Sequence, residues 1–172
     1  SEALALFREH SREELQSDLD FTAEVFGKAV NGFMNENLRE LRKVLTAVEE
    51  KKIHLKQVKR VGTLGVTQLD HDIAVEKGLY YYQGNDFASE IIFSIRRLAE
   101  PMKDHIDNNF SPLSPVQKDD FGKVSEQIIS FLRNCAIMIR KNDYIGFEEL
   151  IAESITLMNQ LTALKKGELK RI

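Results

Sequence analysis

The stretch Asp86–Gln117, DFASEIIFSIRRLAEPMKDHIDNNFSPLSPVQ, contains both a long helical pattern and the clearest break in the chain. In its first half, large apolar residues recur at steps of three or four, which places them on one face of a helix. They are Phe87, Ile91, Ile95, Leu98 and Met102. Proline disfavours a helix interior, so we expect this helix to bend at Pro101.

The second half of the stretch predicts where the next helix begins. Ser114 can cap a helix, Pro115 suits its first position, and Gln117 completes a capping box. The apolar stripe of the predicted helix consists of Phe121, Val124, Ile128, Phe131, Leu132, Cys135 and Ile139. It ends near Asn142 or Asp143, where a last helix can start. The apolar residues of that last helix are Phe147, Leu150, Ile151, Leu157, Met158, Leu161 and Leu164.

Upstream of Asp86, the same apolar face continues back to Leu69, so this helix is predicted to run from there to about Asn108. Gly62 and Gly65 indicate a turn or a loosened segment before it.

The N-terminal part predicts one long helix from residue 11 to the low fifties, with a short helical lead-in. Ser11 and Glu14 have the spacing of a capping box at its start. Apolar residues then continue at helical spacing from Leu15 to Val48. No segment of convincing length alternates as a strand would. We therefore expect an all-α fold, an antiparallel bundle of three to four long helices that forms a single domain over residues 1–172.

Charge and hydropathy exclude several classes of protein. The 24 basic and 27 acidic residues give a net charge of −3, which provides no electrostatic footprint for nucleic acid. The longest apolar runs fall far short of the roughly 18 residues that a membrane-spanning helix needs. The chain lacks an initiating Met and opens directly with helical sequence. We expect a domain taken from a longer protein, which does not itself insert into a membrane.

A line of carboxylates is the strongest candidate for a metal site. Asp72, Glu76, Asp86 and Glu90 share one helical face and, with ligands from a facing helix, would bind a divalent or iron-group metal ion. His105 is a further candidate ligand. The same pattern is also typical of a solvated acidic face, and no cofactor is certain.

The remaining signals do not indicate catalysis. None of the four histidines follows a Glu by three residues, as in di-iron bundles, and no phosphate loop, serine elbow or Cys-x-x-Cys pair is present. We therefore expect a protein that is not an enzyme.

Three tyrosines are consecutive: Tyr80 falls on the apolar stripe, whereas Tyr81 and Tyr82 flank it.

From Gly78 to Ile172 the chain resembles the PhoU-like cytoplasmic domain at the C-terminus of bacterial inorganic phosphate transporters, either Pit-type permeases or sodium-phosphate cotransporters. The resemblance rests on an aromatic pair before Asp86-x-x-x-Glu90, and on an acid-His-x-acid-Asn-Asn segment before a proline-containing turn. The residues of that segment are Asp104, His105, Asp107, Asn108 and Asn109.

The resemblance implies a non-catalytic regulatory or interaction domain at the cytoplasmic face of the inner membrane. Its partner would be the transmembrane part of the transporter, and the residues expected to take part in interaction are Tyr81, Tyr82, Asp104 and Asp107. Two alternatives stay open. One is a free-standing PhoU-like regulator that binds metal through the carboxylate line. The other is a helical oligomerisation module, a homodimer that contacts through Tyr81 and Tyr82.

Overall fold

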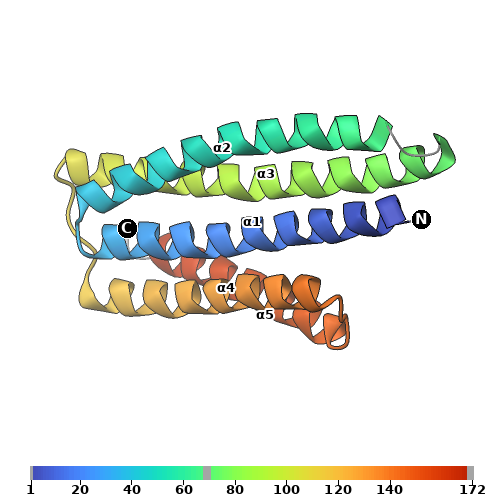
Figure 1. Ribbon diagram of the computed structural model, residues 1–172. Helices are drawn as coiled ribbons and strands as arrows, with labels where there is room; N and C mark the ends of the chain where they lie inside the picture. Colours follow the sequence, from blue (N-terminus) through green and yellow to red (C-terminus); the bar gives the residue numbers. More distant parts are fainter. Residues whose placement is uncertain (1, 68–70, 170–172) are drawn as a thin grey trace.

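The structure, a computed structural model, describes residues 2–67 and 71–169, and the side chains within them other than those of 3–4, 6–7, 61–82, 165 and 168–169. The described residues form five helices and no strand. The helices are α1 (Glu2–Met34), α2 (Leu38–Thr67), α3 (His71–Asp107), α4 (Pro115–Lys141) and α5 (Phe147–Leu169). They form an antiparallel bundle in which α1 packs against α2, α3 and α4, while α2 and α3 lie side by side (Figure 1). The all-α prediction is confirmed.

The predicted single helix from residue 11 to the low fifties is wrong, because the chain turns between α1 and α2. Glu36 has a left-handed backbone with φ of 52°, and the Asn37 amide donates to the Gly32 carbonyl at 2.7 Å. The Asn37 side chain then accepts from the Glu40 amide at 3.1 Å, which caps α2. A Cβ on Gly32 would lie 3.2 Å from the Glu40 Cβ, so the turn is closely packed.

Two other predicted boundaries also differ. Helix α1 begins at Glu2, so Ser11 lies inside it and the capping box predicted there is wrong. Helix α2 continues through Gly62 and Gly65 to Thr67. The connection from α2 to α3 therefore involves residues 68–70, which lie outside the described residues.

The connection between α3 and α4 has the predicted form. Helix α3 continues past Pro101 and ends at Asp107, and Asn109 is left-handed with φ of 54°. The Ser114 hydroxyl accepts from the Gln117 amide at 3.2 Å, and the Gln117 side chain accepts from the Ser114 amide at 2.9 Å. With Pro115 in the first turn, the capping box is complete.

Helix α4 ends at Lys141, and Asn142 follows it in the left-handed conformation with φ of 49°. Four residues further on the chain turns again, through Gly146 with φ of 89°, into α5. This agrees with the end predicted at Asn142 or Asp143.

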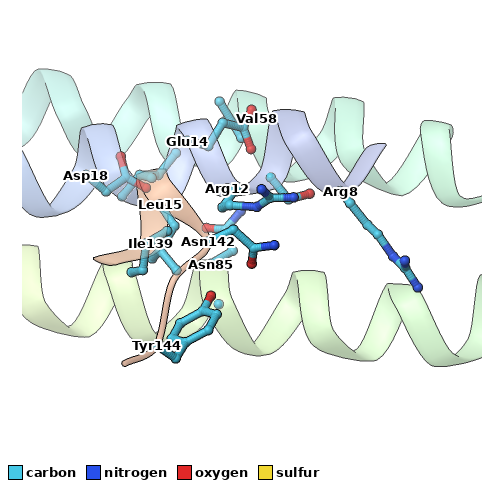
Figure 2. A pocket seen from close by; sticks show the side chains of 13 residues that line it. Arg8, Arg12, Glu14, Leu15, Asp18, Val58, Asn85, Ile139, Asn142 and Tyr144 are labelled. Carbon is cyan, nitrogen blue, oxygen red and sulfur yellow. The ribbon is translucent and has the colours of Figure 1, made fainter. Parts of the chain in front are cut away.

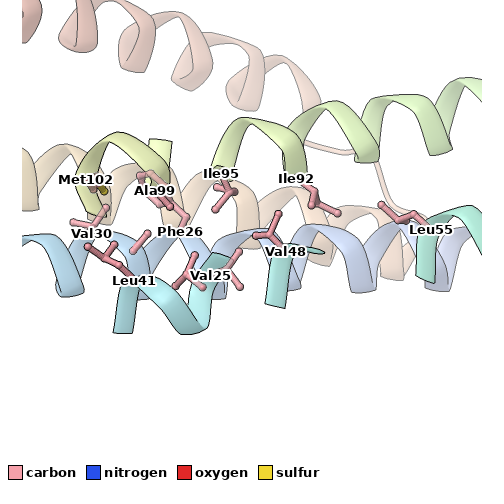
Figure 3. Close-up of a cluster of buried hydrophobic side chains, with 12 residues drawn as sticks. Val25, Phe26, Val30, Leu41, Val48, Leu55, Ile92, Ile95, Ala99 and Met102 are labelled. Atoms are coloured by element: carbon pink, nitrogen blue, oxygen red, sulfur yellow. The ribbon is translucent and has the colours of Figure 1, made fainter. Parts of the chain in front are cut away.

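The main core lies among α1, α2 and α3 (Figure 3). Its fully buried centre includes Leu41 and Val48 of α2 and Ile92 of α3, opposite Phe26 and neighbouring residues of α1. Burial of one such side chain stabilises the fold by about 2–3 kcal/mol. The hairpin of α2 and α3 is thus joined to α1 by a shared apolar centre.

Helix α4 packs on another side of α1. A Cβ on Gly27 of α1 would lie 3.2 Å from the Ile129 side chain of α4, so the two helices approach closely there. The Arg133 guanidinium of α4 pairs with the Asp20 carboxylate of α1 at 3.1 Å. These contacts connect residues more than one hundred positions apart.

Helix α5 buries only part of its predicted apolar stripe. Leu157 is buried and Leu150 and Leu164 are half-buried, whereas Phe147, Ile151, Met158 and Leu161 are exposed. The cause is packing, because α4 is the one described helix that α5 contacts. None of the helices described combines the length and the apolar character that crossing a bilayer requires.

Candidate functional site

The described half of the predicted carboxylate line is exposed and ion-paired. Asp86 lies 3.0 Å from the Lys59 ammonium of α2, and Glu90 lies 3.4 Å from the Arg97 guanidinium of its own helix. The side chains of Asp72 and Glu76 lie outside the described residues. Among those described, no three His, Cys, Asp or Glu side chains gather as metal ligands would. Metal binding by this line stays a prediction.

His105 lies in the last turn of α3, beside the connection to α4. Its Nε2 lies 2.9 Å from the Ser111 carbonyl oxygen, which can only accept, so this nitrogen carries a proton. The ring packs against Phe33 of α1 and Phe110, with centroids 5.4 and 5.3 Å apart. A metal could reach only Nδ1 without breaking this contact.

The acidic residues on either side of His105 also make ion pairs. Asp104 contacts Lys103 at 3.4 Å, and Asp107 contacts Lys103 at 3.2 Å and Arg42 of α2 at 3.8 Å. Both are at the bundle surface, so each pair contributes little to stability. The side chains of Tyr81 and Tyr82 lie outside the described residues, and their predicted interaction role is untested.

The structure contains a cleft that the sequence did not indicate. It has a volume of about 440 Å³ and lies among α1, α2, α3 and the turn between α4 and α5 (Figure 2). Its apolar lining includes Leu15, Leu55, Val58 and Ile139. Its polar lining includes Arg8, Arg12, Glu14, Asp18, Asn85, Asn142 and Tyr144.

Asp18, which lines this cleft, belongs to a buried ion pair. Asp18 of α1 lies 2.8 Å from the Lys51 ammonium of α2, and their side chains are only 11% and 13% exposed. The Lys51 ammonium also lies 5.4 Å from the centre of the Phe21 ring. The paired charges and the ring fix the register of the two helices at this level.

Glu14, one turn before Asp18, has an environment that changes its acidity. Its carboxylate lies 2.8 Å from His10. Burial raises the pKa of Glu14, the neighbouring Asp18 charge raises this pKa further, and His10 and His54 act in the opposite direction. Glu14 and His54 also line a smaller cleft of about 210 Å³ beside the first. The arrangement can bind a charged group or exchange a proton with one.

A weak signal for this cluster exists in the sequence. His10, Glu14 and Asp18 are spaced by four residues, and Lys51 and His54 by three, so each set shares a helix face. In the predicted single helix, however, Asp18 and Lys51 would lie about 50 Å apart. Only the turn between α1 and α2 brings the two sets together.

Comparison with known proteins identified no relative. No protein-family model, no curated protein and no solved structure matches the chain.

Proposed function

We propose that this chain is a non-catalytic regulatory or interaction domain of a bacterial inorganic phosphate transporter, located at the cytoplasmic face of the inner membrane. One observation carries the proposal. The segment from Gly78 to Ile172 carries the motifs that resemble PhoU-like domains, and the helices α3, α4 and α5 that its described residues form within an all-α bundle are compatible with that resemblance.

The chemistry of the motif residues agrees with an interaction role. His105 contacts the Ser111 carbonyl oxygen, and Asp104 and Asp107 form ion pairs with Lys103 at the surface of the bundle. These contacts position the turn between α3 and α4, which forms part of the surface that the bundle presents to a partner. The partner in this proposal is the transmembrane part of the transporter.

Regulation requires that the domain contact two states of the transporter differently. A domain that binds both states equally shifts no equilibrium. We place the differential contact on α3, where Tyr81 and Tyr82 flank the apolar stripe in the sequence.

The first test is to read the genomic frame upstream of Ser1 and to locate the encoded product by cell fractionation. The expected result is several apolar segments of about 20 residues upstream, with the product in the membrane. Phosphate uptake is then measured for the intact product and for one that ends before this domain, and the proposal expects the two uptake rates to differ. Equal rates, with equal amounts of product in the membrane, would contradict a regulatory role.

A soluble product with no apolar segments upstream would overturn the transporter assignment. Elemental analysis of the purified chain and of Asp86→Ala would then test the free-standing metal-binding regulator. A metal bound to the parent and lost from the variant would support that alternative.

A further inference from the structure

Helix α5 presents a second apolar face that no described helix covers. This face, here named the α5 stripe, consists of Phe147, Ile151, Ile155, Met158 and Leu161. Steps of four, four, three and three align these residues, and each is between 39% and 65% exposed. The stripe is about 21 Å long. A continuous apolar surface of this kind on a bundle marks a contact site.

The neighbouring face of α5 already has its partner. Leu150, Leu157 and Leu164 recur every seven residues and include the buried Leu157, which defines the side toward α4. A helix with apolar residues on two faces requires two partners. Figure 1 shows α5 at the edge of the bundle, and the described residues provide only α4.

The charges beside the α5 stripe indicate the second partner. The first turn of α5 is acidic, with Glu148 and Glu149, and its last turn carries the basic Lys166. Glu148 and Lys166 are 18 positions apart, which is about five full turns, so both lie on the same flank of the stripe. In an antiparallel pair related by a two-fold axis, identical flanks face each other.

We propose that a second copy of this chain docks antiparallel on the α5 stripe, with the two-fold axis between Ile155 and Met158. Glu148 of each copy then lies near Lys166 of the other, so the ion pair forms twice. A parallel copy would instead bring acidic ends together and basic ends together. The antiparallel arrangement also pairs the opposite ends of the two helix dipoles. The dimer forms through this chain alone and does not require a transporter.

Sedimentation of the full 172-residue chain tests the pairing directly. The expected mass is twice 19.7 kDa at high concentration, with dissociation on dilution. Ile155→Glu introduces a charge on each side of the two-fold axis and should raise the dimer Kd by about 100-fold or more. The matched control is Ile53→Glu, an equally exposed isoleucine on α2, which should leave the Kd unchanged. A parent chain that is monomeric at every concentration would overturn the proposal.

Charge reversal tests the orientation. Glu148→Lys alone should raise the Kd by about tenfold at low salt, and adding Lys166→Glu to the same chain should restore it. A double variant that is weaker than either single variant would contradict the antiparallel pairing.

Cross-linking provides a readout that does not depend on a destabilising substitution. In a Cys135→Ala background, Ile155→Cys should form a disulfide-linked dimer on oxidation, because the two thiols meet near the axis. Phe147→Cys, at one end of the stripe, should not, because its two copies lie at opposite ends of the pair. Ready cross-linking of Phe147→Cys, or none of Ile155→Cys, would overturn the arrangement.

Discussion

The pair of Asp18 and Lys51 is the least exposed ion pair among the described residues. Removal of one partner would leave a buried charge without compensation. We expect Lys51→Met, which keeps the apolar stem over Phe21, to lower the free energy of unfolding by about 3 kcal/mol. Urea denaturation measures this change.

The matched control is Lys28→Met. Lys28 pairs with Glu24 at 2.9 Å, but both side chains are more than half exposed. The change in the free energy of unfolding caused by Lys28→Met should fall within the error of the same measurement. An equally small effect at Lys51 would mean that Asp18 is hydrated in solution.

Glu14 should make stability depend on pH in an unusual direction. Burial raises the pKa of Glu14 in the folded chain above its ordinary value near 4.5. The folded state therefore binds this proton more tightly than the unfolded state does. This contribution to stability is complete below the ordinary pKa and is lost as pH rises through the raised pKa.

The test compares the parent with Glu14→Gln, which has no carboxyl group to titrate at this position. As pH rises from the ordinary pKa of Glu14 through its raised pKa, the free energy of unfolding of the parent should fall relative to that of the variant. Denaturation of both chains across that pH range measures the difference. A constant difference, or one of the opposite sign, would contradict burial as the dominant cause.

At the scale of elements, the turn between α1 and α2 depends on one side chain. Asn37 caps α2 through the Glu40 amide. Asn37→Ala should lower the free energy of unfolding by about 1 kcal/mol, measured in urea. Asn134→Ala, on the exposed surface of α4, is the matched control and should cause no comparable loss. An equal loss of unfolding free energy in the two variants would show that the Asn37 cap contributes nothing specific to stability.

Helix boundaries were predictable where local side-chain chemistry marks them. Ser114, Pro115 and Gln117 define the start of α4 whatever packs around it. The turn at residues 35–37 lacks glycine and proline, and apolar spacing continues across it from Phe33 to Leu41. Periodicity alone therefore predicted one helix where there are two. The cleft was missed for the same reason, because its residues meet only after that turn.

The apolar pattern of α5 was predicted correctly, but not what it faces. Spacing shows that Phe147 and Leu157 can both be buried, and it cannot count how many neighbours a helix has. That number depends on tertiary packing, in which α5 contacts α4 alone among the described helices. The exposed face is therefore a result of the whole arrangement.

At the scale of the whole molecule, the described helices differ in how many neighbours they contact. Helices α1, α2 and α3 share the main core, whereas α5 is attached through α4. Hydrogen exchange at high dilution should therefore release the amides of α5 before those at the centre of α1 to α3. Uniform protection across the five helices would contradict this order. If α5 pairs with a second copy, its protection should rise with protein concentration.

The central position of α1 has a consequence for the chain as it is being made. The ion pair between Asp20 and Arg133 spans 113 residues, so this side of α1 has no partner until α4 has been synthesised. At ordinary rates of translation that interval is roughly 6 to 23 seconds. Helix α1 leaves the ribosome before the other described helices and is therefore among the last of them to be completely enclosed. During that interval its apolar flank, around Gly27, is a surface that a chaperone can hold.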